Sequence, residues 1–404
     1  MINQATSAVP GAGRADADRR QREALETSGW GERFTFVQPH NLCFWVYVVL
    51  TAIGVLHTVS YFRASAGFFA EAYVVAAVLL GLCGAAWLLW FRHIDRWERQ
   101  PGGLVIAALV WGGFPATFAF ALTVNTAMLS IYAKVFGQEW SANWAAGFTA
   151  PFTEEAAKLC GFLLLIGLAP RLIRTANDGL VIGAFIGLGF AVIENFLYAA
   201  NGAAGAFGAD PIGGAVGVSF ARIGVSFVSH PLFSALVCSG VVYLLGTVAQ
   251  PRRVGRGLAF ILAGMFLHFT WDNAVGLGFG SGVLTIAVMA GSIVLALAIL
   301  TVAFRLAAPR EHQFVRAILA PEVVGGTVTS EEVDAVVDGK ARKAYRRAAP
   351  NRAAGRARKH LSRAILDLTH AVAEAPGTNA DAVLHARAEV ARLRAIAEPP
   401  LHPA

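Results

Sequence analysis

The chain has 404 residues, of which 56% are hydrophobic and 15% charged, with a mean hydropathy of +0.56 and a net charge of +7. Soluble domains are usually about a quarter charged, so this composition excludes an ordinary soluble protein. The charged residues gather in residues 1–35 and 305–404. The middle of the sequence has few charged residues and contains several apolar runs of roughly the 20 residues that cross a bilayer as a helix. An all-α, polytopic helical membrane protein is therefore predicted.

The predicted elements begin with a polar segment, residues 1–40, which is unlike a cleavable signal peptide. A membrane domain follows over residues 41–307, with about eight transmembrane helices. The third span should tilt or break near Gly112–Pro115, and the fourth is short, as is typical of a partly buried helix. The predicted spans are 42–60, 67–91, 104–133, 154–169, 179–200, 223–248, 258–277 and 282–305.

Loop charges predict the orientation of these spans. Cytoplasmic loops carry an excess of Lys and Arg, and a cytoplasmic N-terminus satisfies this rule at every loop. We therefore expect a multi-pass protein of the bacterial cytoplasmic (inner) membrane with both termini in the cytoplasm. The inner loops then carry Arg92, Arg96, Arg99, Arg171, Arg174, Arg252, Arg253 and Arg256, against Arg63, Lys134 and Arg222 outside.

Residues 308–404 are predicted to form a small helical cytoplasmic tail. Thr329 and Glu332 have the spacing of a capping box, which opens a short helix. Apolar residues recur at helical spacing over 361–372, and Pro376 should end that helix. A further helix is predicted over residues 383–396.

The tail contains a basic segment. Between Gly339 and Leu366 the chain has ten Lys or Arg residues and no Asp or Glu. One interpretation is a solvated basic face, and the other is contact with anionic lipid headgroups beside the membrane. Contact with nucleic acid is disfavoured, because no recognition motif accompanies the charge.

Several ionisable and amide side chains lie inside the predicted spans, where such groups are costly and mark functional sites. They lie on the fourth to seventh spans. With the predicted orientation, all of them fall in the outer half of the bilayer, so four helices can share one site. They are Glu154, Glu155 and Lys158; Glu194 and Asn195; His230; and His268, Asp272 and Asn273.

Spacing within two helices supports such a site. Lys158 follows Glu154 by four residues and Glu155 by three, so it can pair with either carboxylate. His268 and Asp272 are also four apart, and a carboxylate one turn from an imidazole can fix its tautomer.

Two histidines and several glutamates in an enclosed, wettable pocket fit metal-assisted hydrolysis. His230 and His268, with Glu155 or Glu194, can hold Zn²⁺ and leave a position for water. Another glutamate can then take the proton of that water. In a metal-free version, glutamate activates the water, and histidine or asparagine polarises the carbonyl.

Over residues 150–275 the chain resembles the PrsW family of intramembrane proteases. The wider group of CAAX-processing and bacteriocin-self-protection proteases is similar in having paired glutamates on one helix and two later histidines. The matching features are the EExxK of Glu154, Glu155 and Lys158, the block DGLVIGAFIGLGFAVIENFLY over 178–198, the span of His230, and HFTWDN over 268–273.

The resemblance implies a metal-dependent peptidase that cuts a membrane-anchored protein near the outer face, such as an anti-sigma factor. It implies that Glu154 and Glu155 are active carboxylates and that His230 and His268 are ligands or polarising groups. Glu194 completes the catalytic set. The supporting residues are Lys158, Asn195, Asp272 and Asn273.

Two other functions fit a multi-span chain with buried charges. Carboxylates and histidines within the membrane also form proton relays in ion-coupled transporters, although no repeat relates residues 42–133 to residues 154–305. The second alternative is a non-catalytic membrane scaffold that binds a partner through its basic tail. The complete set of expected polar residues disfavours it.

Overall fold

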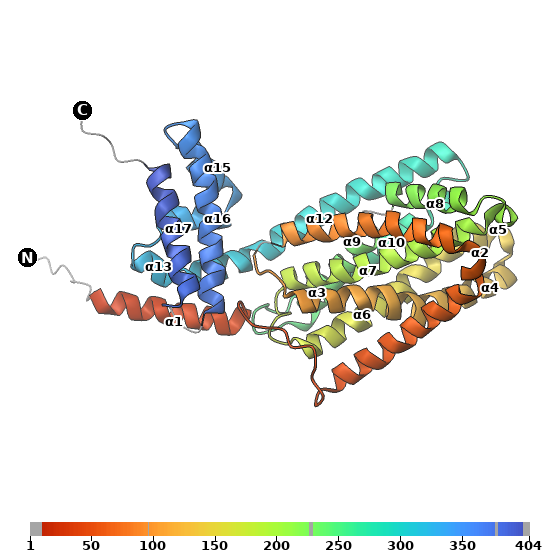
Figure 1. The fold of residues 1–404 in the computed structure, drawn as a ribbon, viewed down its shortest axis with the longest axis horizontal. Coiled ribbons are helices and arrows are strands. Elements are labelled where there is room, and N and C mark those ends of the chain that lie inside the picture. The colour runs from red at the N-terminus through yellow and green to blue at the C-terminus, as the bar shows by residue number, and fades with distance from the viewer. Residues whose placement is uncertain (1–9, 96, 226–228, 376–378, 399–404) are drawn as a thin grey trace, which may run out of the picture. The chain divides into compact units, whose positions relative to one another are not determined.

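The computed structural model describes residues 10–95, 97–225, 229–375 and 379–398, and within them every regular element is a helix (Figure 1). The prediction of an all-α fold is confirmed. The chain divides into two compact units, residues 34–307 and residues 1–33 with 308–404. The sequence predicts residues 1–40 as a separate segment, whereas most of that segment belongs to the same unit as the tail.

The unit of residues 34–307, here called the membrane unit, contains most of the helices. Five helical stretches in the described residues are long and apolar enough to span a membrane: Leu42–His93, Gly102–Phe136, Ala176–Ala203, Val254–Asp272 and Gly282–Ile318. The elements are α2 (Leu42–Ile94), α3 (Gly102–Trp111), η1 (Gly112–Ala121), α4 (Leu122–Phe136), α5 (Gln138–Trp140), η2 (Ser141–Ala145), α6 (Ala146–Leu168), α7 (Ala176–Ala203), η3 (Gly205–Gly208), α8 (Pro211–Val225), α9 (His230–Leu245), α10 (Val254–Asp272), α11 (Ala274–Leu277) and α12 (Gly282–Ile318).

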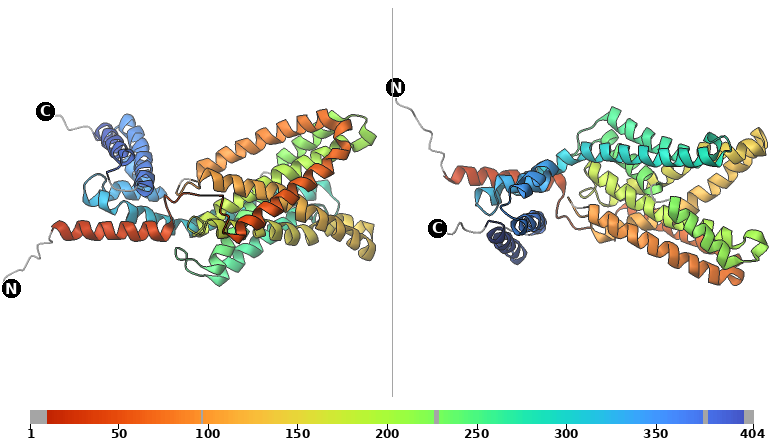
Figure 2. Two further views of the ribbon diagram at one scale, coloured as in Figure 1. Left: turned by 60° about the horizontal axis from the view of Figure 1, so that its bottom comes forward. Right: turned by 90° about the horizontal axis from the view of Figure 1, so that it is seen from above.

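Helix α2 contains both of the first two predicted spans. Phe69 has non-helical angles, φ −121° and ψ 17°, and it separates two arms. The chain reverses direction there, so the arms form a helical hairpin (Figures 1 and 2). The predicted break in the third span is also present. The helix changes to a π-helix from Gly112 to Ala121, which contains Pro115, a residue that cannot donate a backbone hydrogen bond.

Helix α7 lies at the centre of the membrane unit, and glycines let α9 approach it closely. A Cβ on Gly183 would lie 2.5 Å from the carbonyl oxygen of Ser234, and one on Gly187 would lie 2.3 Å from that of His230. Only glycine permits such backbone contact, as in small-xxx-small helix pairs. This packing places the start of α9 against the middle of α7.

Helix α6 begins earlier than predicted. The fourth span is predicted over 154–169, but the helix starts at Ala146 and continues through Pro151. Glu154 therefore lies about 12 Å along the helix and is 4% exposed. The predicted start is wrong because Pro151 and the small residues before it are typical of a helix start. In the structure, Gly147, Thr149 and Ala150 are buried, and this burial keeps the first two turns helical.

The sixth predicted span, 223–248, is wrong at its beginning. Helix α8 ends at Val225, and α9 begins at His230 with Pro231 in its first turn. A proline suits the first turn of a helix and disrupts its interior. His230 therefore lies at a helix start, although the sequence predicts it about 10 Å inside a span.

The second unit combines both ends of the chain. In it, Gln21 donates to the carbonyl oxygen of Ile318 at 2.6 Å, and the ring of Trp30 stacks on His370 with centroids 5.3 Å apart. The predicted capping box of Thr329 is present, while Pro376 lies outside the described residues. The helices are α1 (Pro10–Ser28), α13 (Ala320–Val324), α14 (Ser330–Val337), α15 (Gly339–Arg347), α16 (Arg352–Glu374) and α17 (Asp381–Ala397).

Candidate active site

The predicted site residues of the membrane unit come together at one end of four helices. Glu154 lies on α6, Glu194 on α7, His230 at the start of α9 and His268 one turn before the end of α10, and glutamate oxygens lie within 3.7 Å of both imidazoles. Asn273, just after α10, accepts a hydrogen bond from the backbone N–H of Gly147 in α6 at 3.1 Å. This bond joins the end of α10 to the start of α6.

Lys158 is fully buried and makes contacts with three of the site residues. Its Nζ lies 2.8 Å from Glu155 Oε1, 3.6 Å from Glu154 Oε2 and 3.1 Å from His230 Nδ1. The ammonium also lies 3.9 Å from the centre of the Phe190 ring. A buried ammonium requires such compensation, so Lys158 fixes the adjacent glutamates in place.

Each histidine has a carboxylate at one ring nitrogen. His230 Nε2 lies 2.9 Å from Glu194 Oε2, and His268 Nδ1 lies 3.1 Å from Glu155 Oε1. The other nitrogen of each ring faces Glu154, with His230 Nδ1 at 3.7 Å and His268 Nε2 at 3.6 Å from Oε2. Histidines that bind metals are oriented by carboxylates in this way.

Glu154, His230 and His268 form a group that fits a metal ion. One ligand atom from each lies within 4.8 Å of the others, and all three residues are buried. Ligand atoms of a tetrahedral zinc site lie roughly 3.3–3.6 Å apart, close to the distances found here. Glu154 Oε2 and His268 Nε2 are buried and make no hydrogen bond, so a metal would satisfy two otherwise costly atoms.

The third member of this group differs from the sequence-based expectation. The sequence predicts Glu155 or Glu194 as the carboxylate ligand, but both already form short hydrogen bonds with other residues of the site. Glu155 accepts from Lys158 at 2.8 Å and from Ser234 Oγ at 2.9 Å, while Glu194 faces His230. The geometry therefore favours Glu154 as the carboxylate that would complete the set.

Arg222 of α8 is part of this site, and sequence reasoning missed it. Its Nη2 donates to Glu194 Oε2 at 2.7 Å and its Nε to Asn195 Oδ1 at 2.7 Å. The guanidinium lies 4.2 Å from the centre of the Tyr198 ring. The sequence assigns Arg222 to an outer loop, but its position in the apolar run 211–225 is the signal of a helix that could have found it.

Asn125 of α4 was also missed. Its Nδ2 donates to Glu154 Oε1 at 3.0 Å, and its Oδ1 accepts from Thr153 Oγ1 at 2.5 Å. One oxygen of Glu154 is thereby fixed, which leaves Oε2 directed at the two imidazoles. A lone asparagine in an apolar helix carries no spacing signal, so the sequence alone does not reveal this contact.

A polar cavity of about 390 Å³ opens onto the site. Its lining includes the carboxylates of Glu154, Glu194 and Asp272 and the polar residues Tyr198 and Asn201. Asp272 Oδ2 lies 3.4 Å from His268 Nε2. The cavity therefore reaches the buried histidine–glutamate group through Glu154, which lines it.

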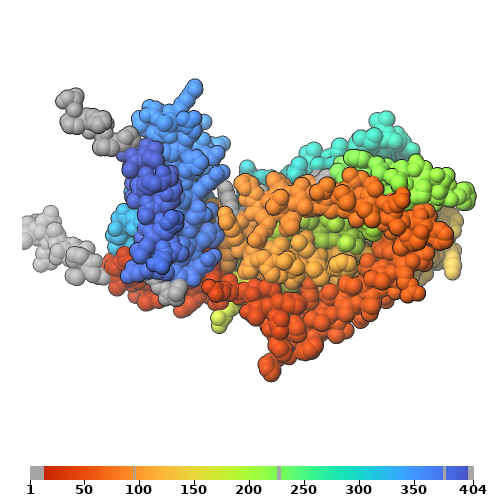
Figure 3. All heavy atoms as spheres, viewed as in Figure 1, coloured from red at the N-terminus to blue at the C-terminus, as the bar shows by residue number. Residues whose placement is uncertain are grey.

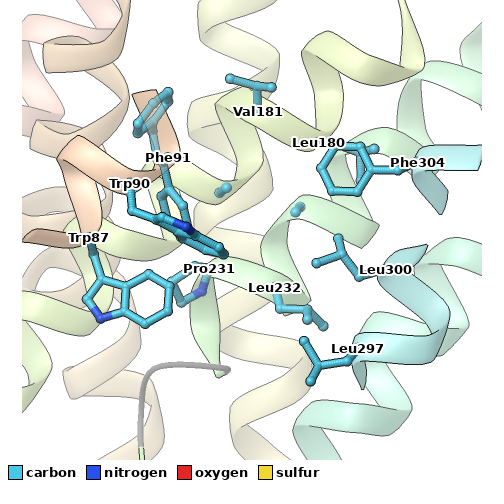
Figure 4. Close-up of a pocket in the computed structure, with 13 residues that line it drawn as sticks. Trp87, Trp90, Phe91, Leu180, Val181, Pro231, Leu232, Leu297, Leu300 and Phe304 are labelled. Carbon is cyan, nitrogen blue, oxygen red and sulfur yellow. The ribbon is translucent and has the colours of Figure 1, made fainter. Parts of the chain in front are cut away.

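A second cavity, of about 100 Å³, is apolar (Figure 4). Trp87 and Trp90 of α2 lie on one side of it and Leu297 of α12 on the other. Pro231, which follows His230, also lines it. Its lining contains no ionisable side chain, so this cavity can hold an apolar group and contributes no catalytic chemistry.

Comparison with known proteins agrees with this geometry. A protein-family model described as "PrsW family intramembrane metalloprotease" matches residues 100–307. No curated protein and no solved structure matches the chain. The matched segment begins just before α3 and ends within α12, so it contains every residue of the site described above.

Proposed function

The chain belongs to the PrsW family of intramembrane metalloproteases, and on this premise we propose that it is a zinc endopeptidase with a protein substrate anchored in the membrane. It would cut that substrate close to the outer face of the bacterial cytoplasmic membrane. One observation carries the proposal: the buried, unbonded Glu154 Oε2 faces a nitrogen of His230 and a nitrogen of His268 at 3.6–3.7 Å.

Glu154, His230 and His268 would hold the ion. When bound, zinc supplies a Lewis acid that polarises the scissile carbonyl and favours deprotonation of water. Two buried nitrogens and a carboxylate suit zinc, because this combination leaves a fourth position open in catalytic zinc sites. The family description names a metalloprotease without specifying the metal. The assignment of zinc is therefore part of this proposal.

Other residues of the chain orient these ligands. Glu194 lies at the far nitrogen of His230 and Glu155 at that of His268, which would orient both rings. The near nitrogen of His230, Nδ1, lies 3.1 Å from Lys158 Nζ, so His230 would exchange this contact for the ion. Arg222 restrains Glu194 by a charge-assisted hydrogen bond. These residues position ligands and need not contact the substrate.

A carboxylate at the cavity must accept the proton of the attacking water. Glu194 is paired with Arg222 at 2.7 Å, which weakens it as a base. Asp272 lines the same cavity, and among the described residues it forms no ion pair with a Lys or Arg; its Oδ2 lies 3.4 Å from His268 Nε2. We assign the proton to Asp272, in place of the glutamate expected from the sequence. It can return the proton to the leaving amine.

The orientation of the protein decides where the substrate is cut. The site lies at the end of the membrane unit where α7 and α10 terminate, and the loop charges predict that this end is the outer one. The resemblance to proteases that release transcription factors supports a membrane-anchored anti-sigma factor as the substrate. The extracytoplasmic segment next to its membrane helix would then enter the polar cavity.

The first test is the metal content of detergent-purified protein, measured together with cleavage of a membrane-anchored reporter. We expect about one zinc per wild-type chain and none in His230→Ala/His268→Ala. Asp272→Asn should retain zinc and lose at least about a hundredfold in cleavage rate, as expected when a general base is removed.

Membrane insertion of each variant is the control. A wild-type protein that cleaves the reporter but contains no metal would overturn the zinc assignment and favour hydrolysis driven by a carboxylate alone. Full activity of Asp272→Asn, with loss of cleavage but not of zinc in Glu194→Gln, would instead identify Glu194 as the base.

A further inference from the structure

We propose that the corner between α15 and α16 is a binding site for the phosphate headgroups of anionic phospholipids. The corner, here called the basic groove, is lined by Lys343, Arg346, Arg347, Ala349, Asn351, Arg352, Gly355 and Arg356. It belongs to the unit formed by the two ends of the chain and not to the membrane unit, which contains the candidate active site. This inference does not depend on the proposed chemistry.

The basic groove is large enough for a headgroup and concentrates positive charge. Its volume is about 740 Å³, and five of its eight lining residues are Lys or Arg, with no Asp or Glu among them. Arg346 and Arg347 end α15, and Arg352 begins α16 after a short turn. Their exposed side chains therefore converge from two helices on one concave surface.

The charge of the basic groove is uncompensated, unlike that of Arg387 and Arg394 in the same unit. Arg387 forms an ion pair with Glu322 at 2.6 Å, and Arg394 one with Glu332 at 2.5 Å. No carboxylate lies within ion-pair distance of the groove cations in the described part of the chain. The groove gathers five unpaired cations on one concave surface, and this concentration of charge favours an external anion.

The tether of this unit to the membrane favours a lipid over a soluble anion. Helix α12 continues without interruption from the apolar Gly282–Arg305 segment to Ile318, and the groove follows within the same unit. Anionic headgroups are therefore always at high local concentration. Guanidinium groups bind phosphate by paired hydrogen bonds, and each basic residue near an anionic surface adds a factor of about five in affinity.

The test uses full-length protein in a neutral maltoside detergent, titrated with short-chain phosphatidylglycerol and, separately, with the matching phosphatidylcholine. The groove variant is Arg347→Gln/Arg352→Gln/Arg356→Gln. The matched control is Lys340→Gln/Lys359→Gln/Arg363→Gln, which removes the same charge from the same basic segment, at exposed residues outside the groove.

We expect wild type and control to bind phosphatidylglycerol at least tenfold more tightly than phosphatidylcholine. The groove variant should lose up to about a hundredfold in affinity for phosphatidylglycerol.

Equal loss in both variants would show diffuse charge attraction, and equal binding of the two lipids would show no headgroup selection. Either result overturns the proposal. So would tighter groove-dependent binding of inorganic phosphate, or of a short RNA, than of phosphatidylglycerol. Reporter cleavage should be equal in both variants in detergent.

Discussion

At the scale of single residues, the site depends on which atom each side chain leaves free. Asn125 fixes one oxygen of Glu154, so the other faces the histidines. Glu194 and Glu155 lie at the far nitrogens of those histidines. Adjacent glutamates in the sequence thus have different surroundings, and in the proposed site Glu154 would bind the ion while Glu155 would orient His268.

Arg222 offers a test of this division of roles. Arg222→Gln should weaken zinc affinity by about 10–100-fold, because Glu194 loses the group that restrains it and His230 loses its orientation. Arg222→Lys should recover part of this loss, since an ammonium can still hold Glu194 but not Asn195 as well. Competition with a fluorescent chelator measures the affinity without any substrate.

Arg63→Gln is the matched control, because Arg63 is an exposed arginine of α2. It should leave zinc affinity unchanged. If Arg222→Gln bound zinc as tightly as wild type while losing cleavage, Arg222 would act on the substrate and not through Glu194.

At the scale of helices, close backbone contacts set the register of the site. Gly183 and Gly187 let α7 touch α9, which places His230 beside Glu194. Gly147 lets the start of α6 touch Asn273 at the end of α10. A shift at either contact would move a ligand by ångströms, and metal coordination tolerates only a few tenths of one.

Gly147→Ala should therefore lower stability and zinc occupancy together. The new Cβ would lie 2.1 Å from Asn273 Nδ2, and Asn273 is fully buried and cannot move aside. Overpacking of this kind costs about 1–3 kcal/mol, seen as an apparent Tm several degrees lower in detergent.

Gly217→Ala in α8 is the control, because a Cβ there meets no atom within 4 Å, and it should be neutral or slightly stabilising. Gly147→Ala/Asn273→Gly removes the clash and should regain part of the zinc occupancy. An unchanged Tm in Gly147→Ala would mean that this junction is looser than the 3.1 Å contact between Gly147 N and Asn273 Oδ1 implies.

At the scale of the whole molecule, two units have separate cores. The membrane unit contains the site, and the other unit combines α1 with the tail helices. Trp30 stacks on His370, and a Cβ on Gly31 would lie 2.2 Å from the carbonyl oxygen of Ala373. The N-terminal segment is therefore a structural part of the tail unit.

Deletion of residues 1–33 should thus destabilise the tail unit and spare the site. We expect limited proteolysis to cleave the tail at least several-fold faster, because the partners of Trp30 and Gln21 become exposed. Zinc content should stay near one per chain. Loss of zinc in step with tail cleavage would show that the two units are energetically coupled.

The sequence by itself determined the all-α membrane fold, the family and the list of polar residues, because composition and motifs are local properties. It did not determine the start of α6, because Pro151 and the small residues before it are typical of a helix start. It did not determine the start of α9 either, since a hydropathy window averages over the end of α8 and the start of α9. It also could not assign Glu154, Arg222 and Asn125. Only the tertiary structure shows how these side chains are arranged, because the arrangement depends on hydrogen bonds between residues 28 or more positions apart.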